Sequence, residues 1–223
     1  LSELWCFPIK SCGPIPLNEI ECGILGAQAG QLRDRVFLVT RPNGEKLTAR
    51  TYPKMLLVSP KIEGNMMTLN APGMNQIEID IGKLYSVTNT LEVKVWKDLA
   101  TCVDCGDEAA SWFSKYIWGE AEGLRLVFYP SSLPKPVIND KGYLFEQADD
   151  RDTGALHDET SYMLMNQSSF DDLNTKIEKP VTALQYRPNF VVKGPELSPW
   201  DEDNWKWVKI GETVFKNVQP CIR

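Results

Sequence analysis

The side chains in this sequence best suited to holding a ligand are basic and polar residues beside apolar, strand-like runs. The stretch "PIKSC" sets Lys10 and Ser11 directly after one run, and "LRDRVFLV" sets Arg35 at the start of another. A third stretch, "YRPNF", sets Arg187 and Asn189 on either side of a proline that fixes the local backbone. Lys, Arg and hydroxyl groups brought together bind anions, and Arg offers planar two-point hydrogen bonds.

Two interpretations of these basic residues are open. Lys and Arg are rarely buried unless they are paired, so basic residues beside three apolar runs could converge on one anionic ligand. They could instead form ordinary ion pairs, for example Arg33 or Arg35 with Asp34 or Glu21. Spacing alone favours the ion pairs.

The sequence lacks the usual catalytic motifs. Its single histidine, His157, lies in a polar stretch with no G-x-S-x-G motif, and the chain has neither a Walker loop nor G-x-G-x-x-G. The paired carboxylates Asp149-Asp150 and Asp171-Asp172 are typical of solvated faces rather than of acid/base pairs.

The six cysteines are scattered along the chain: Cys6, Cys12, Cys22, Cys102, Cys105 and Cys221. A domain of this size does not need disulfides, so we expect reduced thiols and a reducing compartment. The "CVDC" stretch has the C-x-x-C spacing of zinc and redox sites, but a zinc site needs a second pair or histidines. We therefore expect a structural role for these two cysteines.

Length and charge limit the class of protein. A chain of 223 residues with 43% apolar residues can bury a large core, and the net charge of -6 argues against a nucleic-acid partner. No apolar run of about 18 residues predicts a transmembrane helix, and the N-terminus lacks the order of a signal peptide. We expect the chain as it stands to be soluble. The sequence begins on an apolar pattern without Met, so a preceding segment is expected.

Short strands dominate the first 130 residues, which favours a β-barrel or sandwich. Period-2 alternation and β-rich composition predict strands over 4–9, 19–24, 34–40, 55–62, 76–81 and 90–96. Residues 41–44 read as the turn of a hairpin whose second strand is 45–49. The sequence therefore predicts a mostly β fold with a few helices.

One clear helix is predicted over 107–117, since apolar residues recur there at helical spacing. A strand over 124–129, a Pro- and Gly-rich loop and a buried strand over 161–166 follow. A second helix is predicted over 168–177, with Ser168 or Ser169 as N-cap and Asp171 and Asp172 in its first turn. The remaining elements are a strand over 184–194 with Arg187 in its middle and a hairpin over 205–218.

Several motifs together resemble one family. The stretches "FPIKSCGPIPLNEIECGILGAQAGQLRDRVFLV", "LTAR", "DCGDEAASW", "YRPNFVV" and "WVKIGETVFKNVQPCIR" occur in the order found in MOSC proteins, which bind the molybdenum cofactor. Within that family the chain resembles the mitochondrial amidoxime-reducing members over nearly all of its length. The resemblance implies a MOSC N-terminal β-barrel domain over 1–130, a linker over 131–155 and a partial MOSC β-barrel domain over 156–223.

By this resemblance, the molybdenum cofactor lies between the two domains. Lys10, Ser11 and Arg35 would bind its phosphate and pterin from the N-terminal side, and Arg187 and Asn189 from the MOSC domain. The remaining contacts implied by the family are Glu159, Thr160, Ser161, Ile222 and Arg223.

The family's metal ligand is the second cysteine of a Cys-x-Arg-Cys motif. This sequence supplies Cys221, Ile222 and Arg223, so the ligand is expected at the next position, beyond the last residue. Cys221 matches the first, non-ligating cysteine. The resemblance therefore assigns no catalytic residue and no metal ligand within these 223 residues.

The resemblance also implies an activity. MOSC proteins of this group reduce small N-hydroxylated compounds such as amidoximes, with electrons from cytochrome b5 and its NADH-dependent reductase. They face the cytosol from the mitochondrial outer membrane, held by an N-terminal anchor that this sequence does not contain. The alternatives are a sulfurase-type MOSC module that carries or sulfurates the cofactor, and a non-catalytic binding module.

Overall fold

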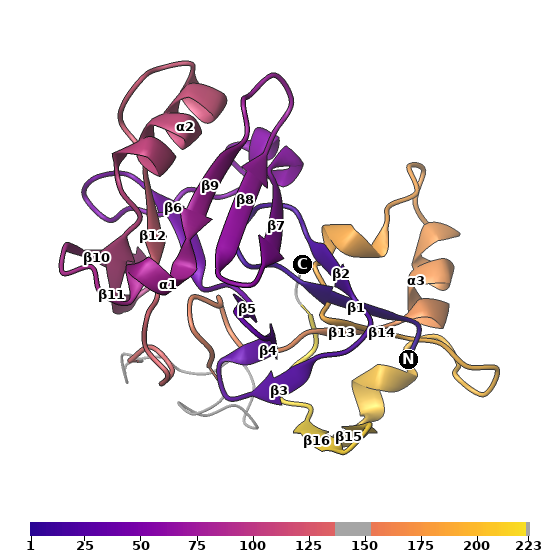
Figure 1. Ribbon diagram of the computed structural model, residues 1–223. Helices are drawn as coiled ribbons and strands as arrows, with labels where there is room; N and C mark the ends of the chain where they lie inside the picture. Colours follow the sequence, from indigo (N-terminus) through magenta and orange to yellow (C-terminus); the bar gives the residue numbers. More distant parts are fainter. Residues whose placement is uncertain (137–152, 222–223) are drawn as a thin grey trace.

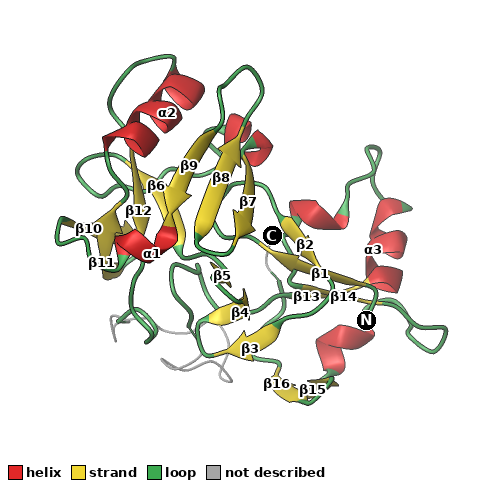
Figure 2. Cartoon of the chain, viewed as in Figure 1, coloured by secondary structure: helices red, strands yellow, loops and turns green. Residues whose placement is uncertain are grey.

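The computed structural model describes residues 1–136 and 153–221, and within them β-strands dominate (Figures 1 and 2). These residues form sixteen strands in five sheets, with three α-helices and three short 3-10 helices. The predicted mostly β fold with a few helices is therefore confirmed.

A four-stranded antiparallel sheet and the helix on it form the centre of the first part of the chain. Its strands, in spatial order, are β10 (Thr90–Val95), β11 (Asp98–Asp104), β12 (Arg125–Phe128) and β6 (Phe37–Thr40). Helix α2 (Asp107–Trp118) packs against β12 through its predicted apolar stripe, which includes the buried Trp112 and Phe113. The helix ends where Gly119 adopts a left-handed conformation, as glycine does at many helix C-termini.

A three-stranded sheet, β7 (Ser59–Glu63), β8 (Met66–Asn70) and β9 (Ile77–Asp80), shares this core (Figure 1). Helix α1 (Ile81–Leu84) follows β9 directly. The strand expected over 55–62 begins only at Ser59, because Pro53 opens a 3-10 helix, η1 (Pro53–Leu57), that buries Met55. The second strand expected over 45–49 is also wrong, since Glu45 and Lys46 form only isolated bridges.

Another sheet joins the two ends of the sequence. Its order is β13 (Leu164–Asn166), β14 (Phe190–Val192), β1 (Glu3–Cys6) and β2 (Ile15–Leu17). Strand β1 runs antiparallel to β14, with Leu4 opposite Phe190. The domain division near residue 130 stays a prediction, and this sheet takes strands from both sides of it.

Two small antiparallel sheets complete the strands. One contains β3 (Glu21–Gly23), β4 (Gly26–Ala29) and β5 (Leu32–Arg33); the other is the predicted hairpin of β15 (Trp207–Ile210) and β16 (Thr213–Lys216). The inner face of this hairpin packs through Phe215 against Tyr162 and Phe190.

The second long helix, α3 (Gln167–Asn174), begins earlier than expected. Asn166 is its N-cap, because the Asn166 side chain accepts a hydrogen bond from the Ser168 N–H, so Ser168 and Ser169 lie inside the helix. The first turn then has no acidic residue, and the prediction that Asp171 and Asp172 lie there is wrong. Two 3-10 helices, η2 (Ala183–Gln185) and η3 (Asp201–Asn204), follow.

The loop predicted over 131–155 lies largely outside the described residues. Its described end, from Thr153 to Ala155, is buried and leads into the equally buried Leu156 and His157.

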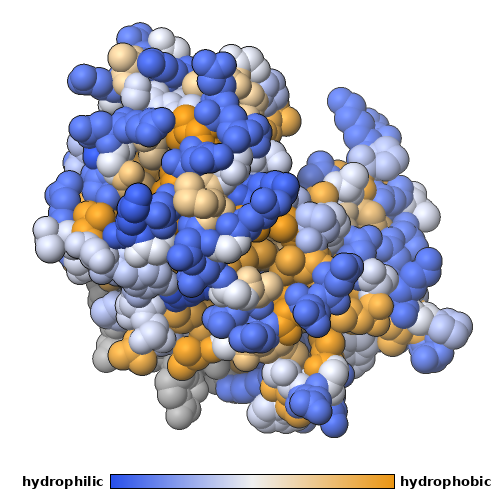
Figure 3. Space-filling model, viewed as in Figure 1, coloured by the Kyte–Doolittle hydropathy of each residue, from blue (hydrophilic) through white to orange (hydrophobic). Residues whose placement is uncertain are grey.

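Figure 3 shows polar side chains over most of one face of the molecule. Apolar side chains gather there in a band between α3 and the part of the molecule that contains β7, β8 and β9. No helix among the described residues is long and apolar enough to cross a membrane.

Candidate functional site

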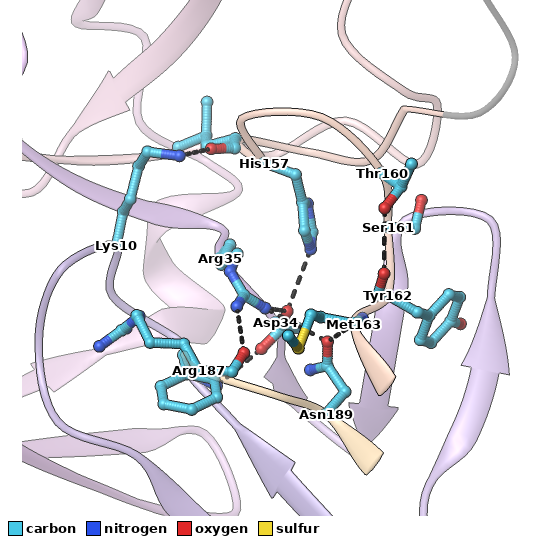
Figure 4. Close-up of polar contacts among 12 residues, drawn as sticks. Lys10, Asp34, Arg35, His157, Thr160, Ser161, Tyr162, Met163, Arg187 and Asn189 are labelled. Carbon is cyan, nitrogen blue, oxygen red and sulfur yellow. Dashed lines mark hydrogen bonds and ion pairs between the residues drawn. The ribbon is translucent and has the colours of Figure 1, made fainter. Parts of the chain in front are cut away.

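The three basic segments singled out in the sequence meet in one buried cluster (Figure 4). Arg35 donates a hydrogen bond through Nη2 to the Arg187 carbonyl at 2.9 Å, and its Nη1 lies 3.4 Å from Oδ1 of Asn189. Lys10 lies in the segment after β1, and its main-chain N–H donates a hydrogen bond to the Phe37 carbonyl at 2.8 Å. The fold therefore places Lys10, Arg35, Arg187 and Asn189 around the described segment from Thr153 to Met163.

The backbone at this cluster is unusual. Ser11, Arg35 and Arg187 have φ angles of 68°, 50° and 58°, in the left-handed region that favours glycine. Only five non-glycine residues of the described chain have a positive φ, and these are three of them. Each such residue costs of order 1–3 kcal/mol, and such conformations gather at functional sites. The prediction that Arg187 lies mid-strand is wrong, because this turn precedes β14.

Arg35 is held by a buried carboxylate that it follows in the sequence. Its Nη1 contacts Oδ2 of Asp34, and its guanidinium lies 5.0 Å from the ring centroid of Phe7. Its predicted ion pair with Asp34 is thus present, whereas Arg33 donates instead to the Tyr85 hydroxyl and the Ser131 carbonyl. In the described residues, Nε–H and one Nη2–H of Arg35 have no hydrogen-bond partner.

Asp34 is a fully buried anion at the centre of the cluster. Its Oδ1 accepts a hydrogen bond from the Phe7 N–H at 2.7 Å, and its Oδ2 lies 3.0 Å from Nε2 of His157. Burial by itself raises the pKa of Asp34, but the Arg35 charge and the His157 hydrogen bond together hold that pKa well below its ordinary value. Asp34 therefore stays ionised and accepts hydrogen bonds only.

Arg187 contacts the segment that follows β1. Its Nη1 donates to the Cys12 carbonyl at 2.7 Å, and its guanidinium carbon lies 4.1 Å from the ring centroid of Phe7. The Phe7 ring is thus contacted by both Arg35 and Arg187. Stacking of guanidinium groups on an aromatic face stabilises cations in a water-poor site.

Lys10 belongs to a second charged group that adjoins the first. Its Nζ donates to the Leu156 carbonyl at 2.7 Å and lies 3.0 Å from Oδ1 of Asp158. The same oxygen accepts a hydrogen bond from Nε1 of Trp96 at 2.6 Å and lies 3.6 Å from Nζ of Lys46. Burial lowers the pKa of Lys10 to about 7, against the opposing attraction of Asp158.

Asn189 and Ser11, two of the predicted contacts, differ in whether their polar atoms are already hydrogen-bonded to the protein. The Asn189 amide is used by the protein, since Oδ1 accepts from the Met163 N–H and Nδ2 donates to the Trp5 carbonyl. Ser11 is half-buried, and its hydroxyl has no polar partner within residues 1–136 and 153–221. Asn189 thus links neighbouring segments of the protein, whereas the Ser11 hydroxyl has no partner among the described residues.

The predicted contacts near residue 160 lie beside the cluster rather than in it. Glu159 is exposed, the Thr160 hydroxyl donates to the Tyr162 carbonyl, and the Ser161 hydroxyl lies within hydrogen-bond distance of the Ile24 and Thr153 carbonyls. Ile222 and Arg223 lie outside the described residues.

Basic side chains gather at this cluster. Lys10, Lys46, Arg35 and Arg187 lie beside the carboxylates of Asp34 and Asp158. A protein with a net charge of -6 thus collects several basic residues at one mostly buried place. These residues and the Ser11 hydroxyl fit an anionic group such as a phosphate.

The described residues offer no alternative metal centre. No group of three or more His, Cys, Asp or Glu side chains among them could hold a metal ion. All six cysteines are free, and burial raises the pKa of both Cys102 and Cys105. These two thiols are therefore protonated packing residues at neutral pH.

Sequence reasoning missed four members of the site: His157, Asp158, Lys46 and Trp96. A lone histidine in a polar stretch gives no pattern from which its burial could be predicted. Trp96 stands in the two-residue turn between β10 and β11 with a φ of 59°, where glycine is favoured, and its sequence gives no sign of this conformation.

Comparisons with known proteins identify the family of the chain. The MOSC N-terminal beta barrel domain model matches residues 1–120, and the MOSC domain model matches residues 151–223. The chain is 35% identical to mitochondrial amidoxime reducing component 2 of Bos taurus and 34% identical to mitochondrial amidoxime-reducing component 1 of Xenopus laevis. It is 30% identical to mitochondrial amidoxime-reducing component 1 of Homo sapiens.

These matches cover 100% of this chain and 64%, 63% and 64% of the three relatives, respectively. The chain thus spans less than two thirds of their length. A solution structure of a Bordetella bronchiseptica protein matches 51% of this chain and 89% of its own, with 21% identity and a TM-score of 0.39, which is too slight a likeness to support an argument. The family models confirm the predicted MOSC N-terminal β-barrel and MOSC domains, and the chain belongs to the MOSC family.

Proposed function

We propose that the basic cluster binds the molybdenum cofactor, with its phosphate and pterin between the segments around Lys10, Arg35 and Arg187. The observation that carries this proposal is the convergence of Ser11, Arg35 and Arg187, all with a left-handed backbone, on one mostly buried site rich in basic side chains. Backbone strain at three such residues persists only where the surrounding structure over-determines it.

The chain's own residues divide the work of binding. Arg35 and Arg187 are fixed on the protein side by Asp34, Phe7 and the Cys12 carbonyl, and Arg35 keeps donors that have no partner among the described residues. Lys10 supplies a buried amino group with a pKa of about 7, and Ser11 supplies a hydroxyl. Ile222 and Arg223, which lie outside the described residues, complete the proposed contacts.

The proposed activity is the reduction of N-hydroxylated compounds such as amidoximes, with electrons from cytochrome b5 and its NADH-dependent reductase. The names of the relatives, which match all of this chain, support this activity. When bound, the cofactor would supply a redox-active metal for the two-electron removal of the N-hydroxyl oxygen. The same names support a mitochondrial location, and we propose an anchor in the outer membrane facing the cytosol.

A binding experiment tests the cofactor. The intact protein is produced in a host that makes molybdopterin, then denatured, and the released pterin is oxidised and measured by fluorescence, with metal analysis alongside. We expect pterin near one equivalent with molybdenum. A protein that carries no pterin would contradict the proposal.

A turnover experiment separates the reductase from the sulfurase-type alternative. Benzamidoxime, cytochrome b5, its reductase and NADH are incubated with the intact protein, and NADH consumption is followed. Consumption above the background without the protein supports the reductase. Bound pterin without consumption would favour a module that carries or sulfurates the cofactor.

A further inference from the structure

We infer that His157 is a positioning residue for Arg35 and, through Arg35, for the cofactor, an inference that rests on the proposed function. Nε2 of His157 lies 3.0 Å from Oδ2 of Asp34, and this same oxygen contacts Nη1 of Arg35. One buried carboxylate therefore links the imidazole to the guanidinium. Figure 4 shows the imidazole of His157 and the guanidinium of Arg35 both directed at Asp34.

The protonation of this pair follows from its surroundings. Burial lowers the pKa of His157 to about 4, opposed by the attraction of Asp34 and assisted by the nearby Arg35 and Lys10 charges. The ring is therefore neutral at pH 7. Because ionised Asp34 only accepts hydrogen bonds, Nε2 must carry the proton. A neutral donor satisfies the carboxylate without adding a second cation beside Arg35.

The imidazole is fixed in place by two glycines. A Cβ at Gly154 would lie 2.4 Å from Nδ1 of His157, and one at Gly26 would lie 3.1 Å from Nε2. Distances under about 3 Å are closer than two such atoms can approach, so a side chain at Gly154 would displace the ring. The slot between these residues sets the orientation from which His157 reaches Asp34.

The backbone around His157 is tied to the same basic residues. The Leu156 N–H donates to the Arg35 carbonyl at 3.1 Å, and the Leu156 carbonyl accepts from Nζ of Lys10 at 2.7 Å. The His157 carbonyl accepts from Nζ of Lys135 at 3.0 Å. His157 thus contacts the carboxylate that pairs with Arg35, and its neighbour Leu156 is hydrogen-bonded to both Arg35 and Lys10.

His157 is the single histidine of these 223 residues, and its ring allows a direct spectroscopic test. In the intact protein labelled with 15N-histidine, long-range proton–nitrogen NMR at pH 7 reports the tautomer of the ring, and the signals of His157 are those that H157Q lacks. We expect a neutral ring protonated on Nε2, and a changed Nε2 signal in D34N. A charged ring, or a ring protonated on Nδ1, would overturn the inference.

Two variants then separate hydrogen bonding from packing. H157Q keeps an N–H that can reach Asp34, whereas H157F keeps a ring of similar shape and removes the donor. We expect H157F to retain roughly tenfold less pterin than wild type, as expected for a lost hydrogen bond to a charged group, and H157Q to stay within about threefold of wild type.

A distant buried variant controls for general loss of stability. Ser114 in α2 donates to the Ala110 carbonyl and accepts from the Leu124 N–H, so S114A removes buried hydrogen bonds without touching the cluster. We expect S114A to keep its pterin. Equal pterin in H157F and wild type, equal losses in H157F and H157Q, or a matching loss in S114A would each overturn the inference. Wild-type protein without pterin would instead overturn the proposed function, and this inference with it.

Discussion

Nη2 of Arg35 donates to the main-chain carbonyl of Arg187 at 2.9 Å, a hydrogen bond between residues 152 positions apart. Both residues have a left-handed backbone, and both guanidinium groups contact the ring of Phe7. The contact joins the segment before β6 to the segment before β14. The position of the Arg35 guanidinium therefore depends on the backbone conformation at Arg187.

Replacing Arg187 with Ala removes a donor to the Cys12 carbonyl and a cation from the cluster. We expect roughly tenfold less bound pterin in the intact protein, because hydrogen bonds to charged groups contribute about 1.5–3 kcal/mol. Pterin fluorescence after denaturation measures the loss. The matched control is R125A, which breaks the ion pairs with Asp104 and Asp107 elsewhere. Unchanged pterin in R187A, or the same loss in R125A, would refute this role.

Replacing Asp34 with Asn leaves the buried Arg35 cation without its carboxylate. We expect the free energy of unfolding to fall by about 3–5 kcal/mol, as happens when one partner of a buried ion pair is removed. Denaturation with urea measures this change. D107N is the control, because Asp107 also pairs with an arginine but its side chain is 96% exposed, so little change is expected. A D34N protein as stable as D107N would show that the buried pair is dispensable.

The stability of the protein should fall in mild acid because of His157. Its pKa is about 4 in the folded protein against an ordinary 6.5, so only the unfolded chain takes up this proton between those values. Stability is therefore lost as the pH falls from about 6.5 to about 4, by up to roughly 3 kcal/mol. The carboxylates of Asp34 and Asp158 also have lowered pKa values, so their contribution to stability is lost only as the pH falls below about 3.8.

Urea denaturation at several pH values checks this dependence. H157Q has no group that titrates at this position, so its stability should change much less across the same window. Parallel curves for H157Q and wild type would assign the acid sensitivity to other groups.

A methyl group at Gly154 should disturb the imidazole slot. The added Cβ would meet Nδ1 of His157 at 2.4 Å, so we expect G154A to lose about 1–3 kcal/mol of stability through overpacking. G23A is the matched control, since its nearest new contact is the Gly26 carbonyl oxygen at 3.7 Å. The cost of G154A should shrink in an H157S background. If it does not, the strain lies elsewhere than against His157.

Local patterns predicted much of the fold. Helix α2 follows from its apolar stripe and its glycine C-cap, and the β15–β16 hairpin follows from alternation about Gly211 and Glu212. The start of α3 was misplaced because Asn166 competed as a cap with two following serines. The strand over 45–49 failed because Glu45 and Lys46 form only isolated bridges, with Lys94 and Thr40, rather than a continuous ladder.

The sequence by itself determined the family and the identity of the basic residues, because motifs such as "PIKSC" and "YRPNF" are short continuous stretches that can be recognised without knowing the fold. It left open whether those residues were ordinary ion pairs or a ligand site. Only the tertiary structure shows that Arg35 pairs with Asp34 and also contacts Arg187 and Asn189. Contacts across more than a hundred residues, and the burial that neutralises His157, arise from folding in three dimensions and leave no local pattern in the chain.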